Sequence, residues 1–164
     1  MTRNAVTQEI YVQPGELIVA ASPSILHTVL GSCVGMTFQA AERGIAALCH
    51  PMLPRCSMKA EQTTDKRSDT RYVDYAIRAV GKTFDAKGIK RSGVVVKVFG
   101  GGDVLPFARG SGRPTVGHLN SAVARQVLSE EGFVVAAESM GGTRGLHLTF
   151  NTVTGEVLLR RLKA

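Results

Sequence analysis

The stretch VDYAIRAVGKTFDAKGIKRSGVVVKVF, residues 73–99, decides the fold class because it places a helix pattern directly before a strand pattern. Gly88 stands where the helix would end, and the β-branched run Val94–Phe99 predicts a strand. A helix and a strand joined so closely indicate layers of helix on sheet. The apolar residues at the spacing of one helix face are Val73, Ile77, Val80 and Phe84.

Short apolar segments flank this stretch on both sides. Four strands are expected before it, at Leu17–Ala20, Ile25–Leu30, Val34–Phe38 and Ile45–Leu48. A second helix is expected over Leu119, Val123 and Val127, followed by strands at Phe133–Ala137, Leu146–Phe150 and Val157–Leu162. The order strands, helix, strand, helix, strands favours one α/β domain over residues 1–164, an α+β-like mixed sheet flanked by helices in a layered sandwich. A doubly wound sheet is disfavoured.

Two connections are long for a compact domain. Pro54–Thr70 is polar and rich in Lys, Arg, Thr and Asp, and it is expected to be mobile or functional. A second segment starts at Gly100-Gly-Gly102 and runs through Pro114, and its glycines predict a flexible rim loop. A phosphate-binding loop is disfavoured there, because no Gly-Lys-Ser/Thr follows.

Composition limits the possible settings and partners. No run approaches the roughly 20 apolar residues that span a bilayer, and no signal peptide is recognisable, so a cytoplasmic location and no membrane insertion are expected. The formal net charge of +7 suggests acidic partners. Nucleic acid is disfavoured as a partner, because only 5% of residues are aromatic and the basic residues are scattered.

The segment Leu30-Gly-Ser-Cys-Val-Gly35 carries the first candidate for chemistry. Cys33 lies between small residues just before a strand, where glycines allow a sharp turn and the close approach of another chain. The Gly-x-Cys-x-Gly spacing also imitates a hydrolase nucleophile elbow, in which a backbone N–H stabilises an oxyanion. The competing interpretation is a small buried cysteine in a turn, since free Cys is among the most buried residue types.

His50 is the candidate base, because it closes a strand-like run and precedes the long polar loop. An imidazole near the thiol would take its proton and return it to a leaving amine. A buried histidine bonded to backbone is the competing interpretation. His27, His118 and His147 are less well placed at a loop-facing strand end. Cys49, His50 and Cys56 fit no usual zinc spacing, so no metal and no cofactor are expected.

The paired motifs Leu30-Gly-Ser-Cys-Val34 and His50-Pro-Met-Leu-Pro54 resemble the signature of the CheD family of chemoreceptor glutamine deamidases. The resemblance extends to Val98–Gly102, Val116-Gly-His-Leu-Asn120 and the last strands, and so covers about Gly15 to the C-terminus. It implies a mixed-sheet fold similar to the deamidase domains of certain bacterial toxins. It also implies hydrolysis of selected glutamines on chemoreceptor cytoplasmic helices, with a CheC-type phosphatase as a possible partner.

The resemblance also assigns roles to residues. Cys33 would be the nucleophile and His50 the base, and the backbone around Gly31, Ser32 and Val34 would stabilise the oxyanion. The family places a Thr shortly before the Cys as a third catalytic residue. Thr28 lies five residues upstream and His27 six, and the Thr28 hydroxyl would either orient His50 or bond a buried carbonyl.

Three functions stay open at this point. A deamidase would use a basic rim of Lys59, Lys66, Arg67 and Arg71 against receptor helices. A non-catalytic adaptor would bind receptors or a CheC-type phosphatase without turnover. Another thiol acyl-transfer enzyme, such as a small protease or a transglutaminase, is disfavoured because no Asp or Asn in a signature context is available to orient the imidazole.

Overall fold

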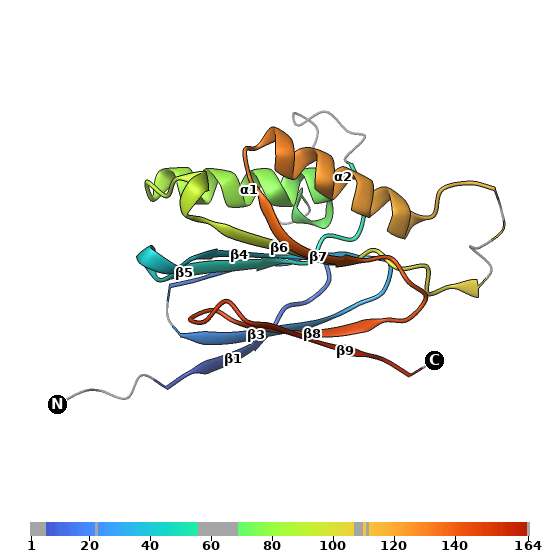
Figure 1. Ribbon diagram of the computed structural model, residues 1–164, viewed down its shortest axis with the longest axis horizontal. Coiled ribbons are helices and arrows are strands. Elements are labelled where there is room, and N and C mark those ends of the chain that lie inside the picture. The colour runs from blue at the N-terminus through green and yellow to red at the C-terminus, as the bar shows by residue number, and fades with distance from the viewer. Residues whose placement is uncertain (1–5, 22, 56–68, 107–109, 111, 164) are drawn as a thin grey trace.

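The strands form two mixed sheets that pack face to face, and both helices cover the outer face of one of them (Figure 1). The computed structural model describes residues 6–21, 23–55, 69–106, 110 and 112–163. The layer order is therefore helices, five-stranded sheet, four-stranded sheet. The outer face of the four-stranded sheet carries no helix in the described residues.

The five-stranded sheet lies in the middle of the molecule. Its strand order is β2 (Leu17–Ala20), β5 (Ile45–Cys49), β4 (Val34–Ala40), β6 (Val95–Gly100) and β7 (Val135–Met140). Only β6 and β7 pair in parallel. All seven residues of β4 are buried, because helices cover one face of this strand and the second sheet covers the other.

The four-stranded sheet has the order β1 (Gln8–Tyr11), β3 (Ser24–Leu30), β8 (Leu146–Asn151) and β9 (Val157–Arg161). Here β1 and β3 are parallel and the other pairs antiparallel. Burial alternates along β8, as expected for a strand with one face in the core. The chain passes from this sheet to the other between β3 and β4, where Cys33 lies.

Each interface between layers has its own apolar core. The helices α1 (Val73–Ala86) and α2 (Val116–Glu130) pack on the central sheet around Phe38, Phe84 and Phe133. A second cluster, which includes Leu26, Leu48 and Phe150, fills the space between the sheets. Short 3-10 segments occur at Ala41–Arg43, Asp69–Arg71 and Arg91–Gly93.

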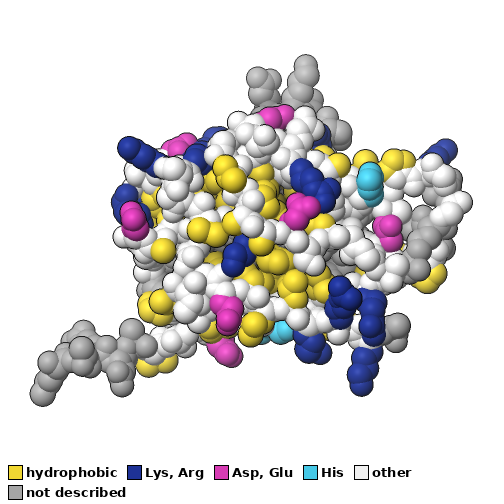
Figure 2. Space-filling view, viewed as in Figure 1, with side chains coloured by type: hydrophobic (Ala, Val, Ile, Leu, Met, Phe, Trp, Pro, Cys, Tyr) yellow, Lys and Arg dark blue, Asp and Glu magenta, His cyan; other side chains and the backbone are white. Residues whose placement is uncertain are grey.

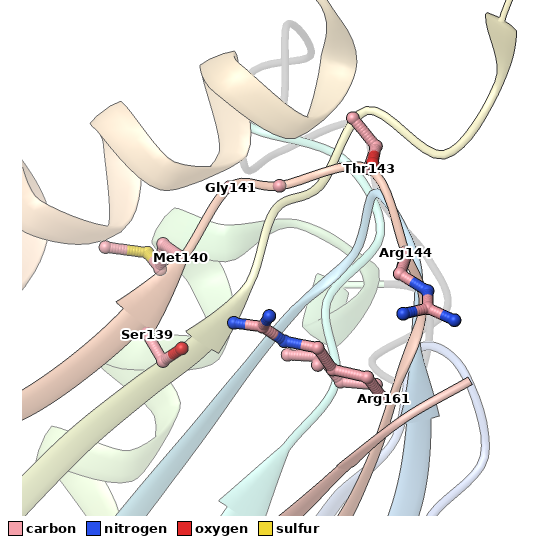
Figure 3. Close-up of a pocket in the computed structure, with 8 residues that line it drawn as sticks. Ser139, Met140, Gly141, Thr143, Arg144 and Arg161 are labelled. Carbon is pink, nitrogen blue, oxygen red and sulfur yellow. The ribbon is translucent and has the colours of Figure 1, made fainter. Parts of the chain in front are cut away.

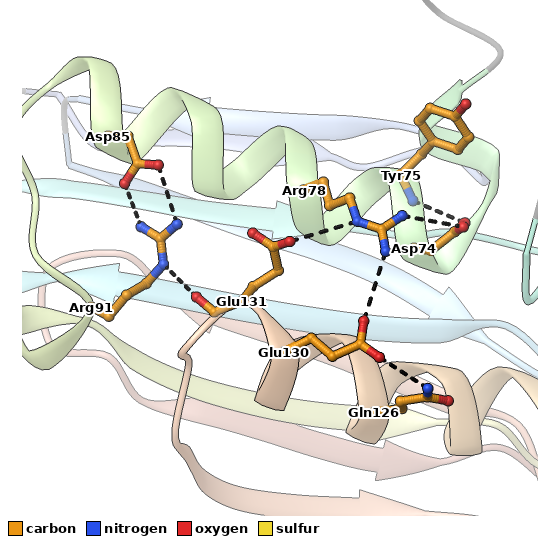
Figure 4. Close-up of polar contacts among 8 residues, drawn as sticks. All are labelled: Asp74, Tyr75, Arg78, Asp85, Arg91, Gln126, Glu130 and Glu131. Carbon is orange, nitrogen blue, oxygen red and sulfur yellow. Dashed lines mark hydrogen bonds and ion pairs between the residues drawn. The ribbon is translucent and has the colours of Figure 1, made fainter. Parts of the chain in front are cut away.

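Ion pairs connect the two helices at their exposed edge (Figure 4). Arg78 of α1 lies within 3.8 Å of Glu130 and 3.6 Å of Glu131, and Arg91 donates to the Glu131 carbonyl at 2.9 Å. Exposed pairs of this kind contribute about 1 kcal/mol or less each, so packing dominates the association of the helices.

The predicted α/β class and layered mixed-sheet architecture are confirmed, with corrections to particular elements. Strand β1 is missing from the prediction, because Gln8-Glu-Ile-Tyr11 holds one aliphatic residue and lies largely exposed at a sheet edge. At the start of the loop predicted from Gly100 to Pro114, the amides of Gly101, Gly102 and Asp103 all bond other loops, and the flexibility of this loop stays a prediction. Most of the polar connection Pro54–Thr70 lies outside the described residues.

Candidate active site

The nucleophile candidate lies on the loop Gly31-Ser32-Cys33, which crosses from β3 to β4. All three carbonyls of this loop accept a hydrogen bond. Gly102 N donates to Gly31 O at 2.9 Å, Asn120 Nδ2 to Ser32 O at 3.0 Å, and Gly101 N to Cys33 O at 2.8 Å. The loop is therefore held from one side along its whole length.

This one-sided support orients the N–H groups of the loop. In a trans peptide the N–H points away from the C=O of the same unit, so the amides of Ser32, Cys33 and Val34 point away from these donors. The Ser32 amide makes no hydrogen bond to any described residue, and the Cys33 amide contacts only the sulfur of its own residue. Two adjacent N–H groups beside a thiol, neither bonded to another described residue, have the composition of an oxyanion site.

Glycines make the close packing behind the loop possible. A Cβ at Gly100, where φ is +94°, would overlap the Cys33 carbonyl oxygen. A Cβ at Gly117 would overlap the Gly102 carbonyl oxygen, because the start of α2 presses against the glycine segment. The three glycines at 100–102 thus let this segment fit between the Cys33 loop and α2.

His50 lies at the same sheet edge as Cys33. It follows β5 directly, and Met36 of β4 pairs with Cys49, so the segment before β4 and the segment after β5 are neighbours. The His50 amide donates to Glu16 O at 2.9 Å, and the side chain is only 1% exposed. Its backbone and ring are therefore fixed by the core.

A hydrogen-bond chain decides which ring nitrogen of His50 carries the proton. Thr28 Oγ1 donates to Val12 O at 2.7 Å, which uses the only proton of the hydroxyl. The same Oγ1 lies 2.7 Å from His50 Nδ1 and must therefore accept from it. The neutral ring then carries its proton on Nδ1, and Nε2 keeps a lone pair. Nε2 is buried and has no hydrogen-bond partner among the described residues.

Both candidate groups are held in their neutral forms. Burial lowers the pKa of His50 to about 4, and the nearby Val12 carbonyl opposes this shift. Burial also raises the pKa of the Cys33 thiol above its usual value, against a backbone hydrogen bond that lowers it. No hydrogen bond joins Cys33 to His50 in the described structure. The resting pair is therefore a thiol and an imidazole base, not a thiolate and an imidazolium.

Asn120 of α2 connects the two segments that carry these groups. It is fully buried, and its Nδ2 donates to Ser32 O and to Met52 O, each at 3.0 Å. One side chain thus holds the residue before Cys33 and the second residue after His50. Its Oδ1 is buried without a partner in the described residues.

A pocket of about 310 Å3 opens beside Cys33. The walls come from Ser32 and Cys33, from Met52 and Leu53, and from the segments 102–105 and 115–117. The side chains at its mouth are mostly apolar, and Met52, Leu53, Leu105 and Val116 are exposed to solvent. Such a pocket accepts a neutral side chain with an apolar stem more readily than a charged one.

The other sequence candidates lie elsewhere. His27 lies on the outer face of the four-stranded sheet, where its ring contacts Tyr11 and His147 at 5.3 and 5.7 Å between centroids. Cys49 is buried, and burial raises the pKa of its thiol to about 12. His118 lies exposed at the start of α2.

Cys56 and the proposed rim residues Lys59, Lys66 and Arg67 fall outside the described residues. Within the described part of the chain, no three His, Cys, Asp or Glu side chains could hold a metal ion, and no helix is long and apolar enough to cross a membrane.

Residue types in the sequence do not identify two contributors to the candidate site. The Val12 carbonyl comes from a segment with no chemical signature, and no pattern marks it. Asn120 stands within the quoted segment Val116–Asn120, and a lone amide near a helix start gives no sign that it will be buried.

Comparison with known proteins adds independent information. A model of the family described as "CheD chemotactic sensory transduction" matches residues 52–161. The "Probable chemoreceptor glutamine deamidase CheD 2" of Geobacter sulfurreducens is 44% identical over 93% of this chain and 89% of its own length. The "Probable chemoreceptor glutamine deamidase CheD" of Oleidesulfovibrio alaskensis is 36% identical over 93% of this chain and 72% of its own length.

Among solved structures, that of YlmD from Geobacillus stearothermophilus has a TM-score of 0.48 at 14% identity, over 84% of this chain and 60% of that one. This likeness is too low for a functional comparison.

Proposed function

The chain belongs to the CheD family, and on that premise we propose that it is a protein-glutamine deamidase that uses Cys33 as nucleophile and His50 as base. Its substrates would be glutamine side chains on the cytoplasmic helices of chemoreceptors, in keeping with the names of its relatives. The protein would accordingly act in the cytoplasm. The observation that carries the catalytic assignment is the Val12–Thr28–His50 hydrogen-bond chain, because it leaves Nε2 as a base.

The first half of the reaction forms a thioester and releases ammonia. The Cys33 sulfur attacks the carboxamide carbon while its proton passes to His50 Nε2. Negative charge on the carboxamide oxygen is stabilised by the N–H groups of Ser32 and Cys33, which the carbonyl bonds behind the loop hold in place. The C–N bond then breaks, and Nε2–H donates its proton to the leaving nitrogen, which departs as ammonia.

The second half restores the thiol. His50 Nε2 takes a proton from water, and the resulting hydroxide adds to the thioester carbon. The C–S bond breaks, the sulfur recovers a proton from Nε2, and the product is glutamate. Throughout, Thr28 accepts from Nδ1–H and keeps the ring in one tautomer and orientation. The apolar pocket favours the neutral amide over the charged product, which assists product release.

The neutral resting pair fits this reaction at ordinary pH. A half-buried thiol beside an uncharged imidazole reacts when the substrate enters and displaces water, so proton transfer accompanies attack. The absence of a Cys33–His50 hydrogen bond is consistent with an unliganded site, in which such contacts are often long.

The test is mass spectrometry of receptor cytoplasmic fragments incubated with the wild-type protein, with Cys33→Ala, or with Cys49→Ala as the matched thiol control. Conversion of an amide to an acid adds about 1 Da. Wild type and Cys49→Ala should modify discrete glutamines, and Cys33→Ala should modify none. Binding without modification by the wild-type protein would replace the deamidase with an adaptor, including one that binds a CheC-type phosphatase.

A further inference from the structure

Three surface depressions form one groove that starts at Cys33. The pocket at Cys33 shares Asp103 with a second depression of about 220 Å3, and the second shares Met140 and Gly141 with a third of about 230 Å3. Backbone contacts also join these parts, because Asp103 N donates to Gly142 O at 2.8 Å. The groove therefore continues from the nucleophile to the β7–β8 connection.

The far end of this groove is basic. Arg144, from the β7–β8 connection, and Arg161, at the end of β9, both line the third depression. Figure 3 shows the Arg161 side chain extending along the groove toward Ser139, with Arg144 on the neighbouring segment. Lys and Arg side chains also gather over the end of the four-stranded sheet near the C-terminus (Figure 2).

These two arginines lack acidic partners in the described structure. Arg144 and Arg161 are exposed, and their side chains form no ion pair or hydrogen bond with any described residue. By contrast, Arg125, which lines the middle of the groove, is paired with Glu138 at 2.9 Å. Two cations without counter-charges make this end of the groove positive, so it is complementary to an anion supplied from outside.

We infer that the groove is a two-part substrate site, in which the Cys33 end takes the target glutamine and Arg144 and Arg161 bind a carboxylate on the same substrate helix. This rests on the proposed deamidase function and adds a substrate preference to it. The exposed apolar mouth around Leu53, Leu105 and Val116 suits the apolar face of an amphipathic helix.

The experiment uses helical peptides with one target glutamine and a single Glu that is moved stepwise along the helix. In the matched control peptides a neutral residue other than Gln replaces that Glu. Ammonia release gives kcat and KM for the wild type, for Arg144→Gln/Arg161→Gln, and for the control Lys87→Gln/Lys90→Gln. The control removes the same charge at exposed positions near the end of α1, at the opposite end of the molecule.

The wild type should prefer the peptide with Glu at one register by roughly five- to tenfold in kcat/KM, through KM alone. The arginine variant should lose this preference while the lysine control keeps it, and high salt should weaken it. An equal loss in both variants, or a preference that survives in the arginine variant, would overturn the inference.

A second readout separates this inference from the reaction itself. Fluorescence anisotropy with Cys33→Ala measures binding of the same peptides without turnover. If Cys33→Ala prefers the acidic peptide, and the variant that combines Cys33→Ala with Arg144→Gln and Arg161→Gln does not, the two arginines bind the carboxylate even when no deamidation is detected. Equal binding of acidic and neutral peptides by Cys33→Ala would refute it whatever the reaction.

Discussion

Replacing Thr28 with Val should lower kcat in a protein that still folds. Val has nearly the shape of Thr and removes only the hydroxyl, which donates to Val12 O and accepts from His50 Nδ1, both at 2.7 Å. The buried Nδ1–H then has lost this acceptor. Either tautomer of the ring then buries an unpaired N–H, so the ring no longer favours the tautomer whose Nε2 can act as a base, and its orientation is no longer fixed.

The size of the effect follows from the cost of a buried, unpaired N–H. That cost is about 1 to 3 kcal/mol, and about 1.4 kcal/mol corresponds to a tenfold change in population. The variant therefore loses the preference of about 1 to 3 kcal/mol for the productive tautomer. Equal tautomer populations alone would lower kcat about twofold, and kcat should fall further because the ring is no longer held in one orientation. The free energy of unfolding should fall by about 1 to 2 kcal/mol, because Val12 O also loses its donor.

The assay compares ammonia release and urea unfolding for the wild type, Thr28→Val and Thr28→Ser. Serine keeps the hydroxyl and loses only a methyl group, so Thr28→Ser should lose stability but retain most of kcat. If Thr28→Val turns over within about twofold of Thr28→Ser, the hydroxyl does not control the tautomer of His50 and the reasoning is wrong.

Three further predictions concern the scaffold. Asn120→Leu removes the amide that donates to Ser32 O and Met52 O. It should lower the free energy of unfolding by about 2 to 4 kcal/mol, measured in urea, and kcat at least tenfold, measured by ammonia release. Full kcat in a folded variant would contradict the positioning role of Asn120. The pKa of His50 in the folded protein is lower than its unfolded value of 6.5, so the unfolded chain binds more protons below pH 6.5. The free energy of unfolding should therefore decrease by up to about 3 kcal/mol as the pH falls from 6.5 toward 4. His50→Asn should flatten this pH dependence and His27→Asn should not; an unchanged slope in His50→Asn would assign it to other groups. Gly100→Ala should lower the free energy of unfolding by about 1 to 3 kcal/mol. Gly93 has open space around it and no positive φ, so Gly93→Ala should change this free energy by less than about 1 kcal/mol. Equal losses of stability in thermal unfolding would contradict the close contact of Gly100 with the Cys33 loop.

Much of the fold was predictable because its signals are local. The helix at Val73–Ala86 and the strand at Val95–Gly100 follow from apolar spacing alone. Periodicity could not divide nine strands between two sheets, since β4 is buried on both faces and its neighbours are set by long-range pairing. The edge strand Gln8–Tyr11 has too few apolar residues to be predicted from the sequence.

The candidate site was predictable at its reactive atoms and not at its supports. A cysteine in a small-residue turn and a histidine at a strand end are visible in the sequence. The choice between His27 and Thr28 depends on the face of β3 that each occupies, and the structure puts Thr28 in the core against His50 and His27 on the outer face. The functional role of Thr28 stays a prediction. The basic end of the groove joins Arg144 and Arg161 across a sheet register that no local pattern encodes.

The central claim is that Cys33 forms a covalent thioester with the glutamine side chain. Rapid quenching in acid during turnover, followed by intact-mass analysis and peptide mapping, tests it directly. We expect an adduct on Cys33 equal to the substrate peptide minus about 17 Da, with a burst of about one ammonia per protein, and no adduct in Cys33→Ala. Continued ammonia release by Cys33→Ala, or an adduct mapped to another residue, would contradict it.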